Sequence, residues 1–147
     1  MRVRICYTSS YMEKRQLAVL ERFSSCQTKE ERYLMLMQLG DELTPLPESF
    51  KVESARVHGC QSTTYLKIEL HDGKVSISGT SDAKISKGLL ALLLLSFNGE
   101  SPEAILTTPF TLPEKLNLPE LLSPSRSQGL SAMHLHLKKA VIPFLKN

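Results

Sequence analysis

The 147-residue sequence has no tryptophan, only three cysteines and a formal net charge of just +3. Cys6, Cys26 and Cys60 lie far apart and form no C-x-x-C pair, which argues against a redox dithiol or a zinc ribbon. A disulfide scaffold is not expected either, because a chain of this length can stabilise a core without one. We therefore predict free thiols in a reducing, cytoplasmic compartment.

Long apolar runs and clusters of basic residues are missing as well. The most apolar stretch, residues 88–97, is about half of what a membrane span requires, so it predicts a buried helix. Charged residues at 13–15 come too early for a signal peptide, and the scattered Lys and Arg form no nucleic-acid-binding arm. There is no glycine loop of the phosphate-binding kind. We expect one folded domain over residues 1–147, with residues 1–11 as a loose N-terminal segment.

Helical periodicity and capping signals predict helices before and after a central sheet in the sequence. Apolar residues recur at helical spacing over residues 12–23. Thr28 and Glu31 fit a capping box at the start of a second helix, which should stop near Gly40. Ser81 and Asp82 predict the start of the apolar helix, as a cap and as a negative charge at the positive end of the helix dipole.

Two Ser-Pro pairs mark later helices, since proline suits the first helical position. Ser101-Pro102 opens a short helix and Ser123-Pro124 opens the last one. The last helix carries a single apolar stripe, and Pro143 marks its end or a kink. The residues of the stripe are Leu130, Met133, Leu137 and Val141.

A strand pattern separates the second helix from the apolar helix. Residues 64–70 alternate between apolar and polar side chains, and residues 75–77 continue the alternation after an Asp72-Gly73 turn. Residues 52–57 could add a third antiparallel strand, which would place Cys60 near the loop joining the first two strands. We therefore predict an α+β fold, with a small three-stranded antiparallel sheet and helices packed on one face.

Cys60 has the most suggestive surroundings of the three cysteines. Gly59 frees the backbone before the thiol, and Ser62 could donate a hydrogen bond to a thiolate or persulfide. An ordinary thiol is only about 3% thiolate at neutral pH, so His58 and Arg126 are candidates for a helping cation. The alternative is a small buried hydrophobic side chain, which also fits Cys6 and Cys26.

Two other kinds of site remain open on the residues alone. His58 and Cys60 could share one face of a strand as metal ligands, but zinc takes three or four protein ligands. Cys60, His134 and Asp82 could form a cysteine hydrolase triad. His134 and His136 lie at i and i+2 of a helix, and an ordinary helix surface accounts for both.

Three sequence blocks together resemble the SufE family of sulfur-acceptor proteins, which includes CsdE. They are RVHGCQS at 56–62, GTSDAKISKGL at 79–89 and LLSPSRSQGL at 121–130, and a weaker block covers 31–40. Thr64 and Tyr65 stand where the family usually has Val-Trp. The resemblance implies a fold like that of SufE and of the IscU scaffold.

The resemblance also implies a function. Cys60 would accept persulfide sulfur from a pyridoxal-phosphate-dependent cysteine desulfurase of the SufS/CsdA kind, stimulate that enzyme and relay the sulfur to an iron–sulfur scaffold. Asp82 and Arg126 match motif positions and are expected near the cysteine loop. The chain itself would need no cofactor or metal and would not be an enzyme. A monomer is expected because the domain is small. A metal or cluster scaffold and a cysteine hydrolase are the alternatives.

Overall fold

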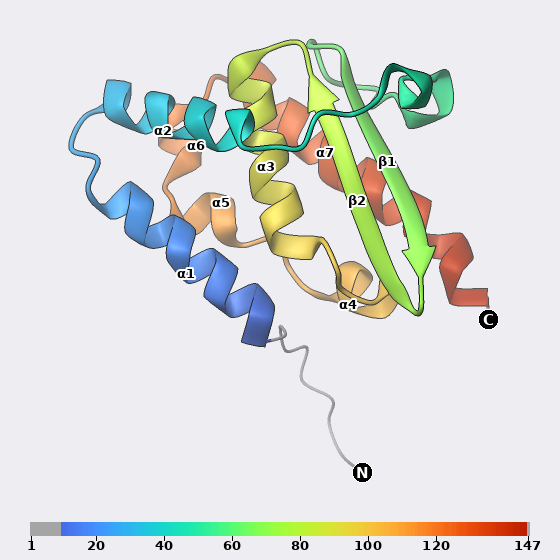
Figure 1. Ribbon diagram of the computed structural model, residues 1–147. Helices are drawn as coiled ribbons and strands as arrows, with labels where there is room; N and C mark the ends of the chain where they lie inside the picture. The colour runs from blue at the N-terminus through green and yellow to red at the C-terminus, as the bar shows by residue number, and fades with distance from the viewer. Residues whose placement is uncertain (1–9, 147) are drawn as a thin grey trace.

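The structure is a computed structural model that describes residues 10–146, and it shows an α+β arrangement (Figure 1). In chain order its elements are α1 (Ser10–Ser24), α2 (Lys29–Asp41), the 3-10 turns η1 (Glu48–Phe50) and η2 (Glu53–Ala55), β1 (Thr64–His71), β2 (Lys74–Ser81), α3 (Lys84–Phe97), α4 (Pro102–Thr107), α5 (Leu112–Lys115), α6 (Leu118–Leu121), α7 (Pro124–Val141) and η3 (Ile142–Lys146). Most of the predicted loose segment, residues 1–9, lies outside the described residues, and residues 10–11 belong to α1.

The predicted hairpin between β1 and β2 is confirmed. The strands pair antiparallel from Thr64↔Ser81 to His71↔Lys74, and the connection is the two-residue loop Asp72-Gly73. Both loop residues have positive φ, at 52° and 76°, as a type I′ turn requires. This turn fixes the register, so the open end of the hairpin holds Thr64 beside Ser81.

The prediction of a third strand is wrong, because the sheet has two strands. Within residues 52–57 the chain forms η2, and the amide of Arg56 donates to Glu53 O at 3.1 Å. That turn uses backbone groups that a strand would offer to its neighbour. Only an isolated bridge between Arg56 and Tyr65 remains. The Glu-Ser-Ala sequence at the centre of residues 52–57 has low strand propensity, and the valines on either side of it do not overcome this.

Helices cover one face of the hairpin, with α3 packed against β2 and α7 against β1 (Figure 1). The inward side chains of the hairpin, Leu66, Val75 and Ile77, are buried. The predicted apolar helix is confirmed as α3, whose leucines form the centre of the core. The predicted stripe of the last helix is also buried, at Leu130, Met133, Leu137 and Val141. No helix within residues 10–146 is long and apolar enough to cross a membrane.

Glycines let α2 and α3 cross in direct backbone contact. A Cβ placed on Gly88 would lie 2.2 Å from Leu36 O, and one on Gly40 would lie 2.8 Å from Gly88 N. Any larger residue at Gly88 would therefore force the two helices apart.

Three of the four predicted helix starts are confirmed. Thr28, Ser101 and Ser123 each accept a hydrogen bond from the backbone amide three residues on. Ser81 is not a cap, because β2 extends through it and α3 begins at Lys84. The Ser81 hydroxyl instead lies 2.9 Å from Thr64 Oγ1 across the hairpin. Tertiary pairing thus outweighs the local capping signal.

Candidate functional site

Cys60 lies on a short loop between η2 and β1, near the open end of the hairpin. A hydrogen bond from Val57 N to Thr64 O, at 2.8 Å, closes the base of this loop. Gly59 has φ +90°, a left-handed conformation that favours glycine, so the chain turns sharply just before the thiol. Cys60 itself is half-buried and turns its sulfur toward α7 rather than into solvent.

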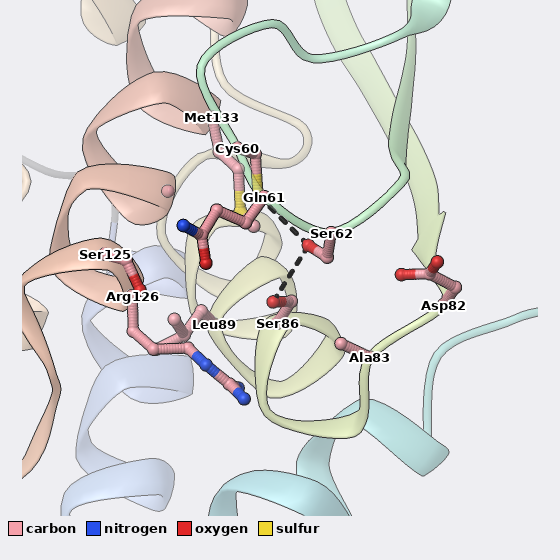
Figure 2. Close-up of a pocket in the computed structure, with 11 residues that line it drawn as sticks. Cys60, Gln61, Ser62, Asp82, Ala83, Ser86, Leu89, Ser125, Arg126 and Met133 are labelled. Atoms are coloured by element: carbon pink, nitrogen blue, oxygen red, sulfur yellow. Dashed lines mark hydrogen bonds between the residues drawn. The ribbon is translucent and has the colours of Figure 1, made fainter.

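The thiol borders a pocket of about 250 Å³ between the loop, the start of α3 and the first turns of α7 (Figure 2). Its walls combine hydroxyl groups, one guanidinium and a few apolar side chains. The lining residues are Cys60, Gln61, Ser62, Asp82, Ala83, Ser86, Leu89, Ser125, Arg126, Gly129 and Met133. The three sequence blocks identified above therefore meet at one place in the fold.

A network of hydroxyl groups lies beneath the sulfur. Cys60 Sγ is 3.1 Å from Ser62 Oγ and 3.7 Å from Thr64 Oγ1. Ser62 Oγ lies 3.0 Å from Thr64 Oγ1 and donates to Ser86 Oγ at 3.0 Å, as Figure 2 shows for the Ser86 contact. Thr64 is fully buried, and Ser81 and Ser86 are nearly so. These polar groups provide hydrogen-bond partners for one another, so the floor of the pocket is polar although Thr64, Ser81 and Ser86 are buried.

Gly129 gives the sulfur room against α7, a role that sequence reasoning did not assign. A Cβ on Gly129 would lie 3.1 Å from Cys60 Sγ and 4.0 Å from its Cβ. Because the glycine has no side chain, the sulfur lies against bare helix backbone. The signal available in the sequence was a glycine inside a helix, which normally costs about 1 kcal/mol relative to alanine.

Asp82 and Arg126 both reach the Cys60 site, but they do different things there. Asp82 Oδ1 accepts from Thr63 N at 3.0 Å, and Asp82 N donates to Thr63 O at 3.1 Å, so Asp82 ties the cysteine loop to the start of α3. The Arg126 side chain runs from α7 toward α3 along the pocket (Figure 2). Its Nη1 is buried with no hydrogen-bond partner among residues 10–146. Arg126, the one cationic side chain that lines the pocket within residues 10–146, therefore retains a donor for a negatively charged group.

His58 does not lie in the pocket. Its side chain is 74% exposed, and Nε2 is 3.3 Å from the equally exposed Glu53 carboxylate. The idea that His58 and Cys60 share one face assumed a strand, whereas the positive φ of Gly59 turns the chain between them. Among the described residues, His58 is therefore paired with Glu53 and is not part of the pocket around the thiol.

His134 is not an ordinary surface residue, contrary to the expectation above. Its ring stacks on Phe97 with centroids 5.4 Å apart and meets Phe110 edge-on at 5.2 Å. Burial, and then the Lys138 charge, lower the pKa of His134 from 6.5 to about 4. It lines a different pocket from Cys60, so the hydrolase triad does not assemble.

A metal centre gains no support from the donor groups. Within residues 10–146 no three His, Cys, Asp or Glu side chains lie close enough together to hold a metal ion. Cys26 sits at the turn between α1 and α2, with Sγ 3.6 Å from Glu31 O. It is half-buried rather than buried as expected, and it does not line the pocket that Cys60 borders. Cys6 lies outside the described residues.

Comparison with known proteins gives a consistent set of similarities. The SufE family model, described as an Fe-S metabolism associated domain, matches residues 17–141. An uncharacterized SufE-like protein of Synechocystis sp. is 35% identical over 126 residues, covering 86% of this chain and 79% of that protein. The cysteine desulfuration protein SufE of Wigglesworthia glossinidia brevipalpis is 34% identical over 130 residues, covering 86% and 89%.

A solved structure shows the same likeness in three dimensions. The solution structure of a hypothetical protein from Thermus thermophilus superposes with a TM-score of 0.72 at 32% identity. The match covers 90% of this chain and 97% of the other.

Proposed function

Since the chain belongs to the SufE family, we propose that it is a sulfur carrier in which Cys60 accepts persulfide sulfur from a cysteine desulfurase. The desulfurase, with its pyridoxal phosphate, would form a persulfide from free cysteine. The carrier would stimulate that enzyme by removing the sulfur, and would then deliver it to iron–sulfur cluster assembly. The carrier would act as a monomer without a cofactor of its own.

The observation that carries this proposal is the position of the Cys60 sulfur. It borders a pocket of about 250 Å³, and bare backbone at Gly129 faces it. A second sulfur bonded to Sγ would therefore have space within this pocket, with the loop, α3 and α7 around it. Such shelter matters because any small thiol that reached an exposed persulfide would take its outer sulfur by exchange.

The transfer step fits the groups present. The Cys60 thiolate attacks the outer sulfur of the desulfurase persulfide, a new S–S bond forms and the desulfurase thiolate leaves. Sulfur moves between two thiolates, so the step requires no oxidant and no general base on the carrier. The product carries a negative charge on its terminal sulfur. Arg126, with buried Nη1 lacking a hydrogen-bond partner among residues 10–146, is suited to stay close to that charge.

Loading and release would be helped by a change in the position of the loop. Cys60 is half-buried with its sulfur toward α7, so moving the loop between residues 57 and 64 out from α7 would present the sulfur to a partner. Such a movement would break the contacts of the sulfur with the hydroxyl network, the Ser62–Ser86 hydrogen bond and the Asp82–Thr63 pair. Docking of the desulfurase would replace these contacts and present the thiol.

The proposal is tested by incubating the protein with a cysteine desulfurase and cysteine, followed by peptide mass analysis without reductant. The peptide containing Cys60 should gain the mass of one sulfur atom. Cys60→Ser should abolish both this adduct and the stimulation of cysteine turnover, while Cys26→Ser, the matched control, should leave both unchanged. Sulfur found on Cys26 or Cys6 instead, with none on Cys60, would contradict the assignment.

A further inference from the structure

The hydroxyl network below Cys60 has a direction, because each hydroxyl carries only one proton. Ser62 Oγ donates to Ser86 Oγ at 3.0 Å, so its single proton is committed to Ser86. The 3.1 Å contact between Ser62 Oγ and Cys60 Sγ can then be a hydrogen bond only if the thiol donates. The neutral S–H form satisfies this arrangement, whereas a thiolate would find no donor in Ser62.

The neighbouring contacts are consistent with the same direction. Ser62 can only accept from Thr64 Oγ1 at 3.0 Å, so the Thr64 proton is committed as well. Thr64 must then accept from Ser81, 2.9 Å away, and Ser81 Oγ in turn accepts from Ala83 N at 3.4 Å. Every hydroxyl therefore donates toward Ser86, and the second hydroxyl near the sulfur, Thr64 at 3.7 Å, is not free to donate either.

We propose that Ser86 is a positioning residue that holds this network in the orientation favouring the neutral Cys60 thiol, and that a sulfur anion reverses it. When Cys60 becomes a thiolate or a persulfide anion, the Ser62 proton turns from Ser86 Oγ to the sulfur, and Thr64 can follow. A charged acceptor makes the stronger hydrogen bond, so the reversal is favourable once the anion exists. The S–H bond breaks when the thiolate forms, and its proton leaves to water. The reorientation of Ser62 that follows breaks no covalent bond.

As a consequence, the Cys60 thiol remains neutral and poorly reactive in the pocket until a partner displaces the loop. Withdrawing the loop separates Ser62 from Ser86, which frees the Ser62 proton for the sulfur at the moment of transfer. This role for Ser86 rests on Cys60 being the sulfur acceptor, but the hydrogen-bond competition itself concerns the free protein and can be measured without a desulfurase.

The measurement is the rate of Cys60 alkylation by iodoacetamide as a function of pH, followed on the Cys60 peptide so that the other cysteines do not contribute. Ser86→Ala removes the acceptor that competes for the Ser62 proton. Losing one neutral hydrogen bond changes such an equilibrium about fivefold, so alkylation at pH 7 should be about fivefold faster and the midpoint of the pH profile about 0.7 units lower. The limiting rate at high pH should not change, because it reports access rather than ionisation.

Three further variants decide between this account and a purely structural one. Ser62→Ala should slow alkylation at pH 7, and adding Ser86→Ala to it should have no effect, because no Ser62 proton remains to be released. Ser86→Thr keeps the hydroxyl and should retain the original midpoint. Ser96→Ala removes another buried hydroxyl of α3, one with no partner among residues 10–146, and should also retain it.

An unchanged or higher midpoint for Ser86→Ala would overturn the proposal, as would the same shift in the Ser62→Ala background. A higher limiting rate with an unchanged midpoint would show that Ser86 only fills space. Because the assay involves no sulfur transfer, these results stand apart from the persulfide test, whose failure would instead remove the carrier function.

Discussion

Replacing Gly129 by alanine tests whether the Cys60 sulfur lies against bare helix backbone. The added Cβ would lie 3.1 Å from Cys60 Sγ, several tenths of an ångström inside ordinary contact. Overpacking of this kind costs about 1–3 kcal/mol, while alanine in a helix interior is favoured over glycine by about 1 kcal/mol. The variant should therefore lose between about 0 and 2 kcal/mol of unfolding free energy.

The sulfur itself provides the decisive comparison. In a Cys60→Ala background the nearest atom of residue 60 to the new Cβ is its own Cβ, 4.0 Å away, which is an ordinary contact. There Gly129→Ala should stabilise the protein by about 1 kcal/mol, from helix propensity alone. The effect of Gly129→Ala on the unfolding free energy therefore differs between the two backgrounds by about 1–3 kcal/mol, which is the coupling between the new Cβ and the Cys60 sulfur.

The unfolding free energies of the wild type, the two single variants and the double variant can be measured by urea unfolding. Circular dichroism is a suitable signal, because the chain has no tryptophan. Gln128→Ala, an exposed neighbour on α7, is the matched control and should have the same small effect in both backgrounds. If Gly129→Ala shifts the unfolding free energy equally with and without the Cys60 sulfur, the sulfur does not lie against Gly129 and the pocket argument fails.

Two further predictions concern the core around the site. The pKa of His134 is lowered to about 4, so the unfolded chain takes up a proton first as the pH falls below 6.5, and stability should be lost between pH 6.5 and 4. His134→Phe should flatten that part of a urea-derived stability profile, whereas His71→Gln, at an exposed site, should not; an equal slope in both variants would refute the role of burial. Gly88→Ala should lower the unfolding free energy by about 3 kcal/mol or more, because its Cβ would lie 2.2 Å from Leu36 O. A loss below about 1 kcal/mol would mean that α2 and α3 separate without cost.

Local signals were reliable where a few neighbouring residues decide the structure. The Asp72-Gly73 turn, the Thr28, Ser101 and Ser123 caps and the buried stripe of α7 all follow from short-range sequence patterns. Turn geometry and capping depend on residues within one turn of the chain, so their signals are complete in the sequence.

Expectations failed where a distant segment competed for the same groups. Ser81 carries a capping signal but pairs with Thr64 across the hairpin, and α3 begins only at Lys84. Residues 52–57 contain two valines that favoured a third strand, but the segment forms the 3-10 turn η2 instead. His134 looked like a surface histidine because Phe97 and Phe110, its ring partners, are distant in sequence.

Sequence alone determined which blocks of this chain matter, since the Cys60 loop, the segment before α3 and the start of α7 each carry recognisable residues. It also determined that Cys60 follows Gly59 and stands two residues before Ser62, and that the chain contains a β-hairpin with helices before and after it. Only the tertiary structure decided what these blocks do together. The direction of the hydroxyl network and the close approach of the Cys60 sulfur to Gly129 depend on distances between residues up to 69 positions apart. Neighbours in the chain cannot specify such distances before the core has packed.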